Sequence, residues 1–182
     1  MTRCERNRDD SFFSASAWAA VGRFLDAPRY PLAGFAQGVV VPDFNADGIS
    51  DLATCGVGDS KSTVSILLGN GDGTFQTHKD FNTGTAPTGI AVEDFNGDGK
   101  LDIVTANFGI DFGFSNEISV LLRNGDGTFQ PDVEYEAGDF PKSVAVGDFK
   151  GDGKLDVVVA NFELADAANK ALCCNCQTYA HF

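Results

Sequence analysis

One nine-residue pattern occurs three times, and this repeat constrains the fold more than any other feature of the sequence. The copies span residues 43–51, 94–102 and 148–156, and each reads Asp-x-Asn/Lys-x-Asp-Gly-x-x-Asp. A second string, Asn-Gly-Asp-Gly-Thr-Phe-Gln, occurs at 70–76 and again at 124–130. Both strings recur after just over 50 residues, a period typical of propellers and related repeat architectures. We therefore expect one structural unit to be repeated along the chain.

Short apolar, β-branched runs flank every copy, as in β-strands separated by tight turns. The expected strands cover 38–41, 52–55 and 63–68 in the first unit, 89–92, 103–106 and 117–122 in the second, and 143–146 and 157–160 in the third. A fourth strand is expected to start at Phe24, Phe75 and Phe129. Four short antiparallel strands per unit form a propeller blade. The sequence predicts an all-β partial β-propeller, with two complete four-stranded antiparallel blades and partial ones.

The predicted organisation has three parts. Residues 1–23 are expected to be a weakly ordered extension, 24–162 the repeats (units 24–74, 75–128 and 129–162), and 163–182 a divergent tail. In the tail, Cys173, Cys174 and Cys176 lack the second pair of ligands that a zinc site needs, so an unstructured segment is predicted. Equal numbers of acids and arginines in the first ten residues do not suit a secretory signal. The abrupt loss of the pattern leaves open a truncated fragment, a frameshift or a capping segment.

Charge and composition exclude several classes of function. The formal net charge of −13 argues against binding to nucleic acid or to an anionic membrane surface. Apolar runs are too short for membrane insertion. Two histidines and the lack of a nucleophile elbow, a zinc-protease helix or a phosphate loop argue against an enzyme.

The repeated aspartate loops have the composition of a calcium site. Side-chain oxygens stand at positions 1, 3, 5 and 9, position 7 offers a carbonyl, and Gly at position 6 permits a sharp turn. Calcium takes six to eight oxygens, and carboxylates this close repel one another without a cation. An EF-hand is excluded, because position 12 lacks the bidentate Glu. Catalytic carboxylates are disfavoured, because three copies indicate a structural task done three times. The predicted ligands are Asp43, Asn45, Asp47, Ile49 and Asp51; Asp94, Asn96, Asp98, Lys100 and Asp102; and Asp148, Asp152, Lys154 and Asp156.

The third loop departs from the pattern at its third position. Lys150 stands where the other loops have Asn45 and Asn96. An ammonium offers no lone pair to a metal and brings a positive charge toward it. We expect the third loop to bind calcium weakly or not at all.

These strings resemble a known family. Asp-Phe-Asn-Gly-Asp-Gly-Lys-Leu-Asp and Asn-Gly-Asp-Gly-Thr-Phe are similar to the FG-GAP/VCBS repeats of integrin α-chain β-propellers, and the resemblance covers about 24–162. It implies a calcium ion in each blade loop, an extracellular or cell-surface location, and ligand binding by other loops or neighbouring domains. Family propellers usually have seven blades, more than this chain encodes.

Two functions follow as expectations. The first is a calcium-binding extracellular module for adhesion or for binding a protein or glycan ligand, with Phe108, Phe112 and Phe114 in the 107–116 insertion as a contact surface. Those rings could instead pack between blades. The alternative is a structural or accessory region of a larger secreted enzyme or surface protein, present here as a fragment. In either case an incomplete ring leaves open blade edges that favour self-association.

Overall fold

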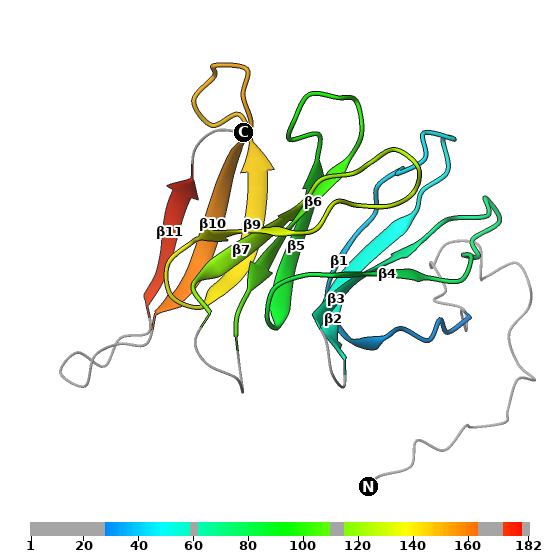
Figure 1. Cartoon of the computed structure of the whole chain (residues 1–182), viewed down its shortest axis with the longest axis horizontal. Coiled ribbons are helices and arrows are strands. Elements are labelled where there is room, and N and C mark those ends of the chain that lie inside the picture. Colours follow the sequence, from blue (N-terminus) through cyan, green and yellow to red (C-terminus); the bar gives the residue numbers. More distant parts are fainter. Residues whose placement is uncertain (1–27, 59–61, 110–114, 164–172, 180–182) are drawn as a thin grey trace, which may run out of the picture.

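The structure, a computed structural model, describes residues 28–58, 62–109, 115–163 and 173–179. Its elements in these ranges are all β-strands, arranged in three antiparallel sheets that lie side by side (Figure 1). Blade 1 comprises β1 (Gly34–Val40), β2 (Leu52–Gly58), β3 (Ser62–Leu67) and β4 (Lys79–Asn82). Blade 2 comprises β5 (Pro87–Glu93), β6 (Asp102–Asn107), β7 (Glu117–Leu121) and β8 (Val133–Glu136). Blade 3 comprises β9 (Pro141–Gly147), β10 (Asp156–Glu163) and β11 (Cys173–Tyr179).

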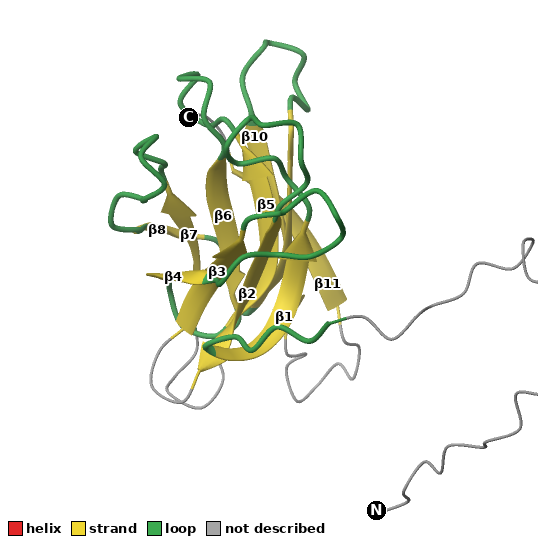
Figure 2. Ribbon diagram, turned by 90° about the vertical axis from the view of Figure 1, so that its right-hand side faces the viewer, coloured by secondary structure: helices red, strands yellow, loops and turns green. Residues whose placement is uncertain are grey.

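Each blade is a meander in which strands adjacent in sequence are hydrogen-bonded neighbours. When the molecule is turned by 90°, blade 1 lies nearest the viewer, with the other two behind it (Figure 2). No sheet formed by the described residues closes into a barrel. The predicted all-β, partial propeller fold of four-stranded antiparallel blades is therefore confirmed.

The predicted fourth strands begin too early. In blades 1 and 2 the fourth strand starts at Lys79 and Val133, four residues after Phe75 and Phe129. Each Phe instead forms an isolated antiparallel bridge, to Gly69 and Arg123 respectively. These bridges close the Asn-Gly-Asp-Gly turns, so the chain must leave the turn before it can pair along the sheet.

No fourth strand is seen ahead of blade 1 in the described residues, although one was predicted near Phe24. Phe24 lies outside the described ranges, and residues 28–33 form no strand. Tyr30 instead packs edge-on against Phe75, with ring centroids 5.6 Å apart, and its hydroxyl accepts the Phe75 N–H at 2.9 Å. This segment therefore covers the turn between β3 and β4.

The cysteine-rich segment is a strand, so the prediction of an unstructured tail there is wrong. Residues Cys173–Tyr179 pair antiparallel with β10, from Val157↔Tyr179 to Glu163↔Cys173. Blade 3 thus has three strands where two were predicted. The physical reason is the edge of β10, whose N–H and C=O groups need partners that an extended segment supplies.

The apolar core lies between the blades, in two clusters. Ile90 of β5 shares a core with Ala53, Cys55, Val64 and Ile66, which are all on blade 1. At the next junction, Val144 of β9 shares a core with residues of β6 and β7, namely Val104, Ala106, Ile118 and Val120. Blades 2 and 3 therefore each bury their first strand against the middle strands of the preceding blade. Burial there also raises the pKa of the Cys55 thiol to about 11.

The first strand of every blade carries a β-bulge at the same register. The ladder skips Gln37 in β1, Thr88 in β5 and Lys142 in β9. At the second junction the bulges touch, because the Thr88 hydroxyl donates to the Lys142 carbonyl at 2.8 Å. The three bulged residues, Gln37, Thr88 and Lys142, are of different types, so the sequence alone does not reveal the bulges.

Candidate metal centre

The three aspartate loops occupy equivalent positions in the three blades. Each joins the first strand to the second, as β1–β2, β5–β6 and β9–β10. In Figure 1 they line the upper edge of the molecule. The fold therefore repeats the loop at one edge, as the sequence period predicts.

Hydrogen bonds shape the first loop around its own aspartate oxygens. Asp43 accepts the Asp47 N–H at 3.2 Å and the Gly48 N–H at 2.8 Å. The Asn45 side-chain oxygen also accepts the Asp47 N–H, at 3.1 Å, and Asp47 accepts the Ile49 N–H at 2.7 Å. The oxygens of positions 1 and 3 therefore converge on one amide.

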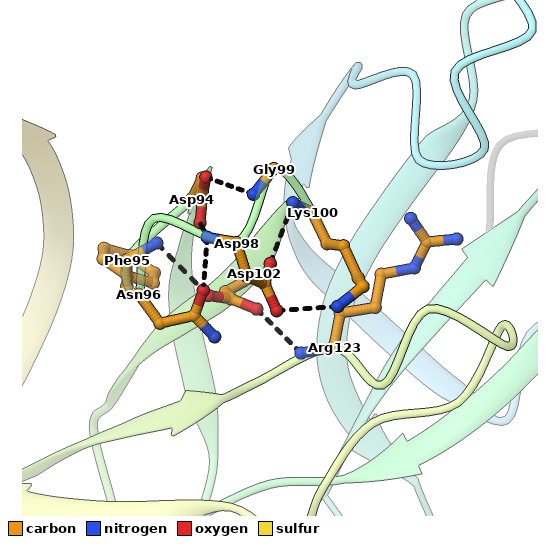
Figure 3. A network of polar contacts seen from close by, with 8 residues as sticks. All are labelled: Asp94, Phe95, Asn96, Asp98, Gly99, Lys100, Asp102 and Arg123. Atoms are coloured by element: carbon orange, nitrogen blue, oxygen red, sulfur yellow. Dashed lines mark hydrogen bonds and ion pairs between the residues drawn. The ribbon is translucent and has the colours of Figure 1, made fainter.

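The second loop repeats these four hydrogen bonds (Figure 3). Asp94 and Asn96 accept the Asp98 N–H at 3.1 and 2.9 Å, and Asp94 also accepts the Gly99 N–H at 2.8 Å. Asp98 accepts the Lys100 N–H at 3.0 Å. Two sequences that differ at three of nine positions thus form the same turn.

The ninth-position aspartate has a structural role that the sequence analysis did not predict. Asp51 is fully buried, and its two oxygens accept the N–H groups of Phe44 and Gly69, each at 2.8 Å. Asp102 does the same for Phe95 at 3.2 Å and Arg123 at 2.7 Å. Each carboxylate ties its loop to the end of the third strand. The contact spans about twenty residues, so no local pattern signals it.

Burial and nearby charges disfavour the ionised form of Asp102. Loss of solvent is the main cause and raises the pKa of this carboxyl, the two backbone N–H groups oppose the shift, and Asp98 and Asp94 add to it. The second loop therefore concentrates negative charge that a cation would relieve.

A lysine already neutralises part of the second loop. The Lys100 ammonium lies 2.7 Å from the Asp98 carboxylate, and this hydrogen bond is the main cause of the lowered pKa of Asp98. From the sequence, Lys100 was expected to offer only its carbonyl as a ligand. Loop 1 has Ile49 at the equivalent position, so its carboxylates have no basic side chain within the loop.

The third loop uses its lysine in a different way. The Lys150 ammonium lies 2.5 Å from one oxygen of the buried Asp156, whose second oxygen has no hydrogen-bond partner among the described residues. Phe149 donates its N–H to the Gly147 carbonyl instead, and its ring is 57% exposed, whereas Phe44 and Phe95 are buried. Asp148 keeps its usual place and accepts the Gly151, Asp152 and Gly153 N–H groups, and these backbone bonds, that of Gly153 above all, lower its pKa.

The donor set of loops 1 and 2 fits an oxygen-seeking cation. All its groups are carboxylate, amide or carbonyl oxygens, which are the ligands calcium prefers. Each oxygen that accepts one N–H keeps a second lone pair for a metal. In the described residues, no three carboxylate, imidazole or thiol groups already surround a common point. Binding would therefore require these side chains to move closer together.

The fourth position of the loop requires a left-handed backbone. Gly97 and Gly151 have φ values of 73° and 71° there, and Ala46 has a φ of 57°. A residue with a Cβ is strained in this region by roughly 1 kcal/mol or more. Loop 1 thus carries a strain that the other two loops avoid.

Ala46→Gly is therefore expected to raise the free energy of unfolding by roughly 1 kcal/mol, and Gly97→Ala to lower it by a similar amount. Urea denaturation of the two variants beside the unmodified chain, in chelator, measures both. Equal signs for the two changes would contradict the assignment of strain to this position.

A groove of about 570 Å³ lies between blades 1 and 2, beside the first two loops. Its wall includes Phe44, Phe81 and Phe129, and three cationic side chains line it, Lys79, Lys100 and Arg123. Arg123 donates to the Phe44 carbonyl and lies over the Phe44 ring at 5.9 Å. Asp126 also lines the groove, so its charged side chains carry a net positive charge in a chain whose formal net charge is −13.

The aromatic insertion predicted as a contact surface is placed only in part. Phe112 and Phe114 lie outside the described residues. Phe108 lies between blades 2 and 3, with ring centroids 5.6 Å from Phe140 and 6.0 Å from Phe162, and Lys142 stacks on it at 4.7 Å. For Phe108, the interpretation as packing between blades is the correct one.

Comparison with known proteins agrees with the repeat and the fold. The FG-GAP-like repeat model matches residues 43–105 and 108–159, which together exceed half of the chain. No curated protein matches the chain. Within the described residues, no helix has the length and apolar character needed to span a membrane. The matched ranges include all three aspartate loops, begin after β1 and end within β10, and the chain belongs to the FG-GAP-like repeat family.

Proposed function

We propose that this chain is a calcium-binding repeat module, in which ions held by the aspartate loops stabilise the blades and a neighbouring surface binds an extracellular ligand. FG-GAP repeats are found in extracellular or surface repeat modules, which supports that location. The observation that carries the proposal is the shared turn of loops 1 and 2, in which the side-chain oxygens of positions 1 and 3 converge on the N–H of position 5.

The three loops differ in their expected affinity. Loop 1 has no internal cation, so calcium neutralises its carboxylates without competition. In loop 2 calcium must displace the Lys100 ammonium from Asp98, which weakens binding. In loop 3 the Lys150 ammonium occupies the place of a ligand and pairs with Asp156. We propose no catalytic role for these aspartates.

Calorimetric titration with calcium, paired with melting curves in calcium and in chelator, tests the proposal. Two sites are expected, together with a calcium-dependent rise in Tm. Asp47→Ala and Asp98→Ala should each remove one site, whereas Asp152→Ala should leave the stoichiometry unchanged. Equal losses of thermal stability in calcium from Asp98→Ala and Asp152→Ala would contradict the ranking of the loops, and the absence of any binding would refute the calcium role.

We place the ligand surface at the groove between blades 1 and 2. Its volume is typical of ligand pockets, and its cations suit a carboxylate-bearing protein or glycan ligand. Screening an array of acidic and neutral glycans and acidic peptides with the chain and with Lys79→Glu tests this placement. Binding lost in the variant is expected, and equal binding by both would move the ligand surface elsewhere.

A further inference from the structure

The first strand of blade 1 presents an exposed apolar face. Val39 of β1 and Val41, just after the strand, are 63% and 64% exposed on the same face. Exposure this high is unusual for two large apolar side chains on one short segment, and contiguous apolar patches mark interaction surfaces.

The same register position is buried in the other two blades. Val39, Ile90 and Val144 are equivalent, since each pairs with the residue three positions after the ninth aspartate of its loop, namely Thr54, Thr105 and Val159. Ile90 and Val144 are only 8% and 9% exposed, because each inserts into the middle strands of the preceding blade. Val39 therefore occupies the position that, in blades 2 and 3, packs against the preceding blade.

The opposite end of the molecule carries the other half of such a contact. In blade 2 the receiving side chains on β6 are Val104 and Ala106. Their equivalents on β10 are Val158 and Ala160, which pair with β9 as Val104 and Ala106 pair with β5. Both are partly exposed, and the described chain places no further sheet against them.

We propose that this chain self-associates head to tail, with the β1 face of one copy docked on the outer face of blade 3 of a second copy. The contact repeats the geometry of the two junctions already present within the chain, so it continues an existing interface. The two faces differ, which makes the contact heterologous and able either to close a ring or to propagate. Two copies would supply six sheets, within the four to eight blades of known propellers.

The mass in solution tests the proposal. Light scattering behind size exclusion, with the full chain in calcium, is expected to give at least twice the 19.2 kDa of one chain. Val39→Glu should reduce this to a single chain, and because Val39 is exposed, folding should be unaffected. The matched control is Val133→Glu on β8, which is also an exposed valine and should leave association intact. A monomeric unmodified chain, or equal association of the two variants, would overturn the proposal.

A mixing experiment separates head-to-tail contact from contact between two β1 faces. Ala160→Glu blocks the tail face and Val39→Glu blocks the head face, so neither variant should associate alone. Their mixture retains one intact pair of faces and should form a heterodimer, detected by energy transfer between dyes on the two variants. Circular dichroism confirms that each variant is folded. Self-association of Ala160→Glu alone, or no heterodimer in the mixture of folded variants, would contradict the head-to-tail arrangement.

Discussion

Replacing Asp51 by alanine is expected to lower the free energy of unfolding by about 2–6 kcal/mol, because two N–H groups lose their acceptor and each costs about 1–3 kcal/mol. The N–H groups are those of Phe44 and Gly69, which hold the loop against the end of β3. A loss of this size is a large fraction of the stability of an ordinary domain. Urea denaturation in chelator measures it without any contribution from calcium.

Asp47→Ala in the same loop is the matched control for this prediction. Asp47 is exposed, and its oxygens accept hydrogen bonds only from groups that water can also reach. Its removal should cost less than about 1 kcal/mol in chelator. If both variants lost the same stability in chelator, the distinction between a structural ninth position and a ligand-bearing fifth position would be wrong.

Lys150→Asn is expected to remove the Lys150–Asp156 ion pair and to make the stability of the protein depend on calcium bound at the third loop. The substitution makes residues 148–156 identical to residues 94–102. Without calcium, Asp156 remains buried with neither an ammonium nor a full set of hydrogen bonds. The loss should be about 1–3 kcal/mol, below the value for a fully buried pair because Lys150 is 42% exposed. With calcium, the variant should gain one site in calorimetry and recover its stability.

Lys154→Asn provides the control, since it makes the same change in charge within the same loop and leaves the Lys150–Asp156 pair intact. It should bind the same number of calcium ions as the unmodified chain. A Lys150→Asn variant that is no less stable in chelator and gains no site would show that another feature of the third loop prevents binding.

The strands could be predicted because their signals are local. Alternating apolar residues and Gly-containing turns fix where β2, β6 and β10 begin, and the repeat of the aspartate string fixes which loops are equivalent. The fourth strands were misplaced, since Phe75 and Phe129 look like strand residues but pair across their own turns. Strand β11 was missed, because the partner that orders it is the edge of β10 and is not encoded in its own composition.

The aspartate loops were located correctly, but the roles of their side chains depend on tertiary contacts. The sequence treats Asp51 and Asp102 like the other aspartates of the loop, whereas the fold buries them against Gly69 and Arg123. The reach of Lys100 to Asp98 depends on a side-chain rotamer that spacing does not determine. The sequence showed that Lys150 departs from the loop pattern, and the structure shows that its ammonium pairs with Asp156.

The bulge shared by β1, β5 and β9 has a geometric consequence for any assembly of these blades. An extra residue in one strand of a pair bends that strand and increases the local twist. Because the extra residue falls at the same register in all three blades, each sheet is bent at the same point before it meets its neighbour. The angle between neighbouring blades is then set within each repeat unit. In a closed ring, this angle fixes the number of blades, and so the number of chains that share the ring, whatever the length of any one chain.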